Sequence, residues 1–387
     1  MRGPAELVDR DGEWVALREL ADLDRPALGL LYGRRRVGKT YLLRHAWPRE
    51  RVFFFTASET TSAFNRTELI RAVAEWSGED IRAEDYPTWR TVFRRLLELG
   101  GDRALVIVLD EYQYLRGDDG DAVDSELNAA WEGYIYGAGA RRALVLILCG
   151  SVVGIMSTLN TGARPLYGRF DWQAHLKPFD YMDAGIMTQA GDLRDRVRYY
   201  GIYGGTPRYL ATIDSRRTLA QNVTRTVLAP DGPVRLQLET AIEQESGLVE
   251  PAQHRAIVAA IAAGHTDRNA IAQAVGMAAD ATFRSRLDTL IELDYIAPTR
   301  NFDAAANQPY RYVIADPAVR FYHGLVLPYR NALVHGDAAG TVWRDVVIPR
   351  LDSYLGHTFE VIARQASVRV RERSSKALPL VKDWGRW

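Results

Sequence analysis

The segment from Leu28 to Leu43, LGLLYGRRRVGKTYLL, constrains the fold of this chain more than any other. An apolar run that predicts a buried strand leads directly into GRRRVGKT, which fits the pattern G-x-x-x-x-G-K-[ST] without a mismatch. Glycine is needed at Gly33 and Gly38, because a Cβ there would obstruct a loop whose backbone N–H groups turn inward around phosphate oxygens. A helix is predicted to start near Lys39, with its positive end facing the same anion. The segment therefore predicts a P-loop within an α/β domain.

Each position of this loop has an expected role in binding a nucleotide. Lys39 would contact the β- and γ-phosphates, and the hydroxyl of Thr40 would bind a magnesium ion that bridges them. The residues predicted to line the nucleotide are Gly33, Arg34, Arg35, Arg36, Val37, Gly38, Lys39, Thr40 and Tyr41. The three arginines have alternatives, because they could contact phosphate, point into solvent or pair with acidic neighbours. For the whole loop, the alternative is a glycine-rich turn that merely joins a strand to a helix.

A second apolar run, Leu105 to Leu109, ends in the acidic pair Asp110 and Glu111. It predicts a strand buried on both faces, with the pair at the carboxyl edge of a parallel sheet, where ligands bind in open α/β folds. This is a Walker B element, in which Asp110 would hold the magnesium ion opposite Thr40 and Glu111 would polarise the attacking water. An acidic pair that only ends a strand and faces solvent is the alternative.

Two further apolar runs extend the predicted sheet. Residues 51–56, RVFFFT, follow the P-loop helix, so strand, loop, helix and strand form the unit that a parallel sheet requires. Residues 143–151, ALVLILCGS, predict another buried strand, with Cys149 as an inert structural thiol near its end.

Composition limits the class of protein. The 387 residues suffice for two or three domains, and 49 basic against 49 acidic residues give no whole-chain signature of nucleic-acid binding. The single cysteine excludes an internal disulfide framework and fits a reducing compartment. No secretory signal is visible, and no apolar segment approaches the ~20 residues of a membrane span. We therefore expect a cytoplasmic protein with no membrane partner.

Five motifs, in the order GRRRVGKT, LDEYQYL, LCGSVVGIM, PLYGRFDWQAHLKPFDYMDA and YYGIYGGTPRYL, resemble the archaeal-type ATPase family of the STAND branch of AAA+ proteins. The resemblance covers residues 5 to about 330 and implies a nucleotide-dependent signalling switch. It implies that Ser151 senses the γ-phosphate, that Arg169 approaches a nucleotide in its own or a neighbouring subunit, and that Pro207 lets a helical lid contact the nucleotide. The alternatives at these positions are a strand end, a surface ion pair and a tight turn that opens a helix.

The C-terminal half predicts a winged helix and a tail. Three helical segments, the third from Ala281 to Leu293, precede two short strands around a polar tip, which is the order of a winged helix-turn-helix. Its basic residues, too few for ready base recognition, are Arg284, Arg286, Arg300 and Arg311. The tail resembles restriction-nuclease-like domains, with Glu360 at the place of a first metal ligand. Because the chain stops at Val381–Trp387, where the metal-binding hairpin would begin, we expect Glu360 to be structural.

The predicted fold is α/β: a P-loop NTPase of the AAA+/STAND type with a parallel sheet core and a helical lid, followed by an α+β winged helix domain. The expected domains are an ATPase core (1–185), a lid (186–248), a winged helix (249–330) and a partial nuclease-like segment (331–387). We expect a slow ATPase that depends on ATP and Mg²⁺, with Glu111, Lys39 and Arg169 as catalytic residues and Thr40 and Asp110 as metal ligands.

The expected role is a signal-transduction switch that couples nucleotide state to the winged helix. The alternatives are a DNA-binding regulator and a defence-type ATPase in which ATP controls the nuclease-like tail. Besides ATP, the candidate partners are double-stranded DNA, a second protein and another copy of the chain.

Overall fold

The computed structural model describes residues 8, 10–100, 105–117, 120–137, 143–245, 248–300, 308–335 and 338–373. Two compact units divide the chain, Met1–Leu176 and Lys177–Trp387. The first unit ends at Leu176 rather than at the predicted boundary of residue 185, because helix α8 (Tyr181–Thr188) packs against α9 (Leu193–Tyr203) in the second unit. Within the described ranges, no helix combines the length and the apolar character that crossing a membrane requires.

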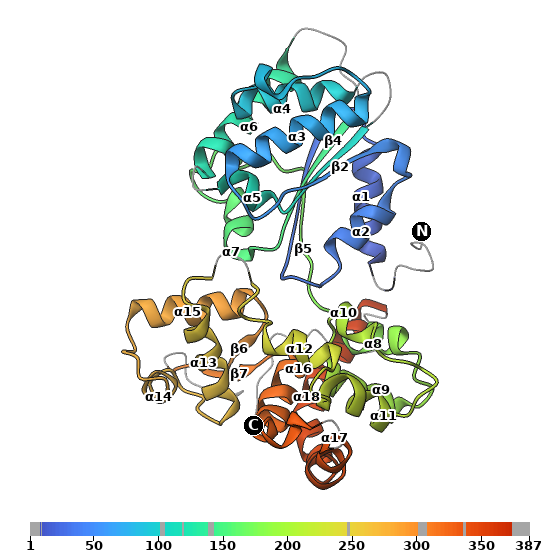
Figure 1. Ribbon diagram of the computed structural model, residues 1–387, viewed down its shortest axis with the longest axis vertical. Helices are drawn as coiled ribbons and strands as arrows, with labels where there is room; N and C mark the ends of the chain where they lie inside the picture. Colours follow the sequence, from blue (N-terminus) through green and yellow to red (C-terminus); the bar gives the residue numbers. More distant parts are fainter. Residues whose placement is uncertain are drawn as a thin grey trace. The chain divides into compact units, whose positions relative to one another are not determined.

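A five-stranded parallel sheet forms the core of the first unit (Figure 1). In the spatial order β2-β3-β4-β1-β5, its strands are β1 (Ala27–Tyr32), β2 (Val52–Thr56), β3 (Leu105–Asp110), β4 (Leu144–Gly150) and β5 (Trp172–His175). Every residue of β1, β3 and β4 is buried, as their continuous apolar runs predict. Strand β5 was not predicted from the sequence: its residues WQAH alternate apolar and polar, but four residues are the shortest run in which such a pattern indicates a strand. Its pairing with β1, which sets Gly29 opposite Trp172, defines it as a strand.

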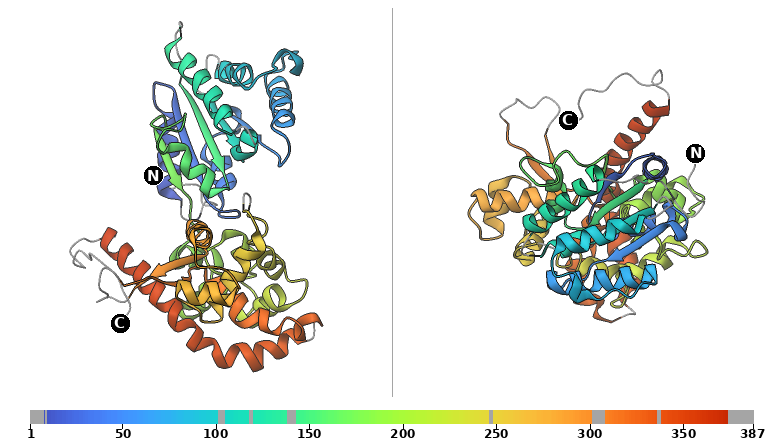
Figure 2. Two further views of the ribbon diagram at one scale, coloured as in Figure 1. Left: turned by 90° about the vertical axis from the view of Figure 1, so that its left-hand side faces the viewer. Right: turned by 90° about the horizontal axis from the view of Figure 1, so that it is seen from above.

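Helices cover both faces of this sheet (Figures 1 and 2). One face carries α1 (Asp11–Ala21) and α2 (Lys39–Ala46), and the other carries α3 (Ser62–Ser77), α4 (Trp89–Leu97) and α6 (Gly120–Tyr136). Two short helices, α5 (Tyr112–Arg116) and α7 (Val153–Met156), follow β3 and β4. The sheet thus has helices on both sides, as in a doubly wound α/β core.

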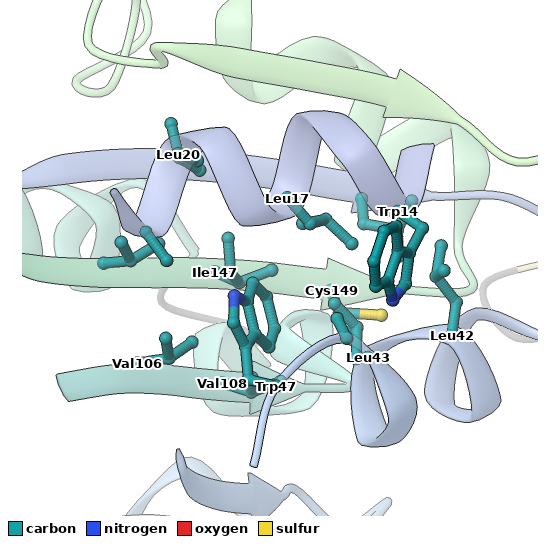
Figure 3. Close-up of a cluster of buried hydrophobic side chains, with 14 of the residues drawn as sticks. Trp14, Leu17, Leu20, Leu42, Leu43, Trp47, Val106, Val108, Ile147 and Cys149 are labelled. Carbon is teal, nitrogen blue, oxygen red and sulfur yellow. The ribbon is translucent and has the colours of Figure 1, made fainter. Parts of the chain in front are cut away.

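Figure 3 shows the apolar cluster beneath α1 and α2, where Trp14 and Leu17 of α1 meet Leu43 of α2 and the side chains of β4. Cys149 lies in this cluster and has no exposed surface. Burial, with the nearby charge of Asp110, raises the pKa of its thiol well above the usual value. The prediction of an inert thiol at the end of a buried strand is confirmed.

Short helices open the second unit, in the range 186–248 for which the sequence predicts a helical lid. After α8 and α9 come α10 (Pro207–Leu210), α11 (Leu219–Val223), which continues as a π-helical turn (Thr224–Leu228), and α12 (Pro233–Glu239). Gly204 ends α9 because its φ of 64° lies in the left-handed region. Pro207 and Pro233 then each open a new helix, because a first helical residue needs no N–H donor.

Three helices and a hairpin follow, in the order that the sequence predicts. They are α13 (Pro251–Ala262), α14 (Arg268–Ala274) and α15 (Ala281–Glu292), then β6 (Ile296–Thr299) paired antiparallel with β7 (Arg311–Ile314). Asp267 and Asp280 start α14 and α15 by accepting backbone N–H bonds at 2.9 Å. The expectation that Arg286 is available for phosphate is wrong, because its side chain is buried against α13 and pairs with Glu250.

The C-terminal elements complete the second unit. They are α16 (Pro317–Phe321), a π-helical turn (Tyr322–Val326), the 3-10 turns Leu327–Tyr329 and Ala332–Val334, α17 (Ala338–Val342), a second π-helical turn (Trp343–Val347) and α18 (Ile348–Arg373). The long helix α18 (Figure 2) packs on α9, where the Tyr354 hydroxyl donates to the Gly201 carbonyl oxygen at 2.7 Å. At its far end, Arg369 pairs with Asp180 and Asp183 at the start of α8. The predicted lid and tail therefore belong to one compact unit.

Glu360 lies on α18, half-exposed and 3.5 Å from the imidazole of His357. Among the residues that the structure describes, no group of three or more His, Cys, Asp or Glu side chains is arranged to hold a metal ion. The predicted end of the nuclease-like segment, Val381–Trp387, lies outside the described residues.

His323, buried in the second unit, makes stability depend on pH. Burial, helped by the charge of Arg255, lowers its pKa from 6.5 to about 4. The unfolded chain therefore takes up this proton at a higher pH than the folded chain. The contribution of His323 to the free energy of unfolding is fully present above pH 6.5 and is lost as the pH falls from 6.5 to 4. By linkage, the loss is about 3 kcal/mol.

We expect His323→Leu to remove most of this loss, measured as the free energy of unfolding in urea at pH 7.5 and 4.5. The control is His265→Gln, at an exposed position. The His265→Gln variant should lose as much stability between pH 7.5 and 4.5 as the parent chain does. His254 adds to the loss in both proteins, because burial lowers its pKa as well. Equal pH dependence in His323→Leu and the parent would contradict the assignment.

Candidate nucleotide-binding site

The loop between β1 and α2 has the backbone that a phosphate-binding turn needs. Gly38 has a φ of 97° and is the N-cap of α2, and Arg36 also lies in the left-handed region with a φ of 71°. Alternation of left- and right-handed residues turns successive N–H groups toward one centre, which is the geometry of an anion-binding nest. At Gly33, a Cβ would lie 2.2 Å from the carbonyl oxygen of Leu176. The chain itself therefore excludes a side chain there, next to the end of β5.

Lys39 begins α2, as the sequence predicts, and its side chain is buried. Its ammonium lies against the loop, donating to the carbonyl oxygens of Gly33 at 2.7 Å and Arg34 at 3.2 Å. The charge is thus fixed inside the turn, beside the positive end of the helix dipole. Both features favour a bound anion at this place.

The other predicted loop residues differ in how far they are buried. Val37 has 1% of its surface exposed and belongs to the apolar cluster, so it anchors the loop. Arg34 is buried, and Arg35 donates to the Tyr114 hydroxyl at 2.8 Å and lies 3.9 Å from Glu59. Of the alternatives for the arginines, pairing with an acidic neighbour therefore holds for Arg35.

Tyr41, on the first turn of α2, is 47% exposed and stacks on His45 with ring centroids 4.1 Å apart. Its predicted contact with nucleotide stays a prediction.

Thr40 and Asp110, the two predicted magnesium ligands, are in direct contact. The Thr40 hydroxyl donates to Oδ2 of Asp110 at 2.7 Å, although the residues are 70 positions apart. Asp110 ends β3 and is 2% exposed, and its Oδ1 accepts the backbone N–H of Glu111. Hydroxyl and carboxylate oxygens are the donors that Mg²⁺ prefers when phosphates and water complete its shell, so this pair fits the ion.

Glu111 occupies a left-handed position, with φ 54° and ψ 43°, between β3 and α5. Its Oε2 accepts a hydrogen bond from the Ser151 hydroxyl at 2.7 Å, so the ends of β3 and β4 are joined side chain to side chain. The same oxygen accepts a bond from the Gln113 carboxamide at 2.5 Å. The solvated acidic pair considered as an alternative is wrong, because Asp110 is buried and Glu111 is held by two neighbours.

A buried polar network fixes the short helix after the Walker B pair. The Tyr112 hydroxyl donates to Asp124 of α6 at 2.9 Å, and Arg116 makes an ion pair with the same carboxylate at 2.9 Å. Burial raises the pKa of Asp124, which Arg116 and the other hydrogen bonds oppose. Burial, followed by the charge of Asp124, raises the pKa of Tyr112 well above 10. Removing one partner of such a buried pair typically costs about 3–5 kcal/mol, so α5 and the turn before it are firmly held.

Arg169 and Pro207 are not part of this contact group. Arg169 makes an ion pair with Glu132 on α6, and both side chains are partly exposed. Pro207 is the first residue of α10 in the second unit, where Gly205 precedes it. A Cβ on Gly205 would lie 1.8 Å from the Phe179 carbonyl oxygen, so glycine is required there by a close backbone approach. The roles of Arg169 and Pro207 toward nucleotide stay predictions.

Gln113 is the site residue that the sequence analysis did not single out. It lies two positions after Glu111, on a helix of five residues, where a polar side chain normally faces solvent. Its side chain is instead 94% buried, as a 6% exposed fraction shows. The sequence does carry one indication of this burial: in the run DEYQYL, Gln113 lies between two aromatic residues.

The fold and the joined Walker A and Walker B residues define this site as that of a P-loop ATPase. Comparison with protein families agrees: residues 7–213 match the model described as an ATPase domain predominantly from Archaea. The match covers more than half of the chain, which therefore belongs to this family, and nucleotide binding is implied by membership.

Individual relatives are distant. An uncharacterized protein of Methanocaldococcus jannaschii is 24% identical over 98% of this chain and 81% of its own length. Among solved structures, a Walker-type ATPase of Pyrococcus abyssi aligns over 83% of this chain and 97% of its own, with a TM-score of 0.56 and 22% identity. The Aeropyrum pernix ORC2 protein, solved as ADPNP–ADP complexes, aligns over 93% of this chain and 97% of its own, with a TM-score of 0.51 and 14% identity. These two likenesses show a shared fold.

Proposed function

We propose that this protein is a magnesium-dependent ATPase that works as a switch. ATP binding by the first unit would change how the second unit meets its target, and slow hydrolysis would reset it. The observation that carries the proposal is the hydrogen bond between Thr40 and Asp110, because it brings the two predicted magnesium ligands together at the mouth of the loop. The nucleotide complexes of the Aeropyrum pernix ORC2 protein, which shares the fold, agree with this assignment.

The chain's own groups would act by positioning and by charge. Lys39 and the N–H groups of the loop would hold the phosphates, and Thr40 and Asp110 would hold the magnesium ion, which neutralises charge on the transferred group when bound. Glu111 would orient the attacking water. Ser151, hydrogen-bonded to Glu111, would report the γ-phosphate to the same carboxylate. Phosphoryl transfer needs little more than this arrangement.

The second unit would carry the output of the switch. Its helices α13, α14 and α15 and the β6–β7 hairpin have the element order of a winged helix, which we propose as the effector. Of its basic residues, Arg284 has a 70% exposed side chain, with Asp288 3.9 Å away, and Arg300 lies over the ring of Tyr310. Arg311 is exposed at the start of β7. With Arg286 buried, only three of the four predicted basic residues remain for phosphate, which favours a protein target over DNA.

One experiment tests this function. The ATPase rate should be measured with and without double-stranded DNA, alongside the mass of the protein in solution with ATP. We expect slow hydrolysis that requires Mg²⁺ and changes little with DNA. Strong stimulation by DNA would favour the DNA-binding regulator or the defence-type ATPase, and the absence of both binding and hydrolysis would exclude the ATPase.

Arg169→Ala tests the arginine that the family resemblance assigns to catalysis. We expect ATP binding to persist and most hydrolysis to be lost, since an arginine supplied to phosphoryl transfer raises rates about 10³-fold or more. To reach the nucleotide, the Arg169 guanidinium would have to leave its ion pair with Glu132 and contact a phosphate instead. Arg164→Ala is the matched control, because Arg164 lies on the same segment and pairs with Asp121 of the same helix.

Mixing Arg169→Ala with Glu111→Gln then shows where the arginine acts. Recovered activity would mean that one subunit supplies it to another, and no recovery would mean that it acts within its own chain or that the chain is a monomer. Parent-like hydrolysis by Arg169→Ala would leave the residue as a surface ion-pair partner of Glu132.

A further inference from the structure

The carboxylate of Glu111 is held in an unsymmetrical way. Both of its recorded side-chain donors, Ser151 at 2.7 Å and Gln113 at 2.5 Å, reach the same oxygen, Oε2. The two donors also lie close to each other, with 3.4 Å between the Gln113 carboxamide nitrogen and the Ser151 hydroxyl oxygen. Only two side chains of the described residues therefore fix this oxygen, and both are almost fully buried.

Glu111 dictates the orientation of the Gln113 carboxamide. With the nitrogen toward Oε2, the carboxamide oxygen of Gln113 is buried and has no hydrogen-bond partner within the described part of the chain. The flipped amide would place that oxygen against a carboxylate, and two acceptors would then repel each other. The Gln113 carboxamide thus donates to Glu111 through its nitrogen, while its oxygen stays buried without a donor, which costs free energy.

The neighbouring backbone is shaped to admit this side chain. A Cβ on Gly150, at the end of β4, would lie 2.4 Å from the carboxamide oxygen of Gln113 and 2.7 Å from the sulfur of Met156. Any other residue at this position would displace Gln113 from its place. The left-handed backbone of Glu111 then lets its carboxylate turn back to meet residues 113 and 151.

We propose that Gln113 is a positioning residue for ATP hydrolysis, which gives the two oxygens of Glu111 different tasks. Oε2 is fixed by Gln113 and Ser151, and Oε1 is the oxygen that accepts the hydrogen bond of the attacking water. The proposal rests on the proposed function, since it assigns a supporting group to the same carboxylate. Gln113 touches neither ATP nor water in this arrangement and acts through Glu111 alone.

Gln113→Met tests this assignment, because methionine has nearly the same shape but cannot donate. We expect kcat to fall about tenfold, while KM and the ATP-dependent rise in melting temperature stay within about twofold of the parent values. The melting temperature without ATP should not fall, since the substitution also removes the unsatisfied oxygen. Gln173→Met, on β5 in the same unit, is the matched control and should keep the parent kcat.

The decisive comparison uses Glu111→Gln as a second background. If Gln113 acts through Glu111, adding Gln113→Met to Glu111→Gln should lower kcat no further, as coupled residues in a double-mutant cycle do. Equal tenfold losses in both backgrounds, or a raised KM in place of a lowered kcat, would overturn the proposal. If Gln113→Met unfolds, Gln113→Leu provides the second test, because leucine also fills the site without donating to Oε2. A lowered kcat with an unchanged KM is expected, and a parent-like kcat would contradict the proposal.

Failure of the proposed function would look different. A parent chain that binds ATP but hydrolyses none would overturn the ATPase assignment and, with it, the task given to Glu111. A parent chain that hydrolyses ATP, together with a Gln113→Met variant of equal kcat, would overturn the role of Gln113 alone.

Discussion

Lys39→Ala is expected to abolish nucleotide binding. The buried ammonium of Lys39 is fixed against the carbonyl oxygens of the loop, so the substitution removes the main point charge for the phosphates and leaves the loop's N–H groups alone to bind them. In the parent chain, ATP with magnesium at a hundred times Kd should stabilise the folded state by about 2.7 kcal/mol. In the variant, the same ligand concentration should produce almost no shift in melting temperature.

Lys177→Ala is the matched control for this prediction. Lys177 carries the same charge in the second unit, but its side chain is 62% exposed and pairs with Asp294 at 3.4 Å. Such a surface pair contributes at most about 1 kcal/mol, so this variant should fold normally and show the full shift with ATP. A full shift in Lys39→Ala would instead mean that the loop does not bind the phosphates.

Glu111→Gln is expected to separate binding from chemistry. The carboxamide keeps the size of the side chain and can still accept a hydrogen bond from Ser151, so ATP affinity should stay within a few fold of the parent value. Turnover should fall roughly a hundredfold or more, the scale of a lost general base. Steady-state hydrolysis and the ATP-dependent thermal shift, measured on the same preparation, check both halves of the prediction.

Glu68→Gln is the control for the change of charge. Glu68 lies on α3 and pairs with Arg71 at 2.5 Å, with both side chains partly exposed, so its loss should leave turnover at the parent rate. If turnover survives in Glu111→Gln as well, another group must orient the water, and Glu111 would serve only to end the strand.

The sequence predicted the core elements well where the signal was local. A buried strand reads as a continuous apolar run, a loop that needs left-handed φ contains glycine, and the helix start at Lys39 follows from the P-loop pattern. These features depend on neighbouring residues only. The order of the strands β1 to β4, and the helix α2 that follows the P-loop, could therefore be written down from the residues alone.

Predictions failed or stayed open where a long-range partner decides. The strand β5 exists because β1 offers it a free edge, and its own four residues carry little signal. The phosphate contact expected of Arg286 is wrong because Glu250, 36 positions away, pairs with it in the fold. Likewise, no local pattern announces that Arg169 pairs with Glu132, so its role was inferred from resemblance and is still a prediction.

The amino-acid sequence by itself determined which residues we propose for the chemistry: the loop ending at Lys39 and Thr40, and the pair Asp110 and Glu111. Only the tertiary structure decided how these groups touch. The Thr40 hydroxyl reaches Asp110 across 70 positions, and Ser151 reaches Glu111 across 40, because parallel strands bring their carboxyl ends to one edge of the sheet. The same edge turns Gln113 from an ordinary helix residue into a buried donor, since side-chain burial depends on the neighbours that the fold supplies.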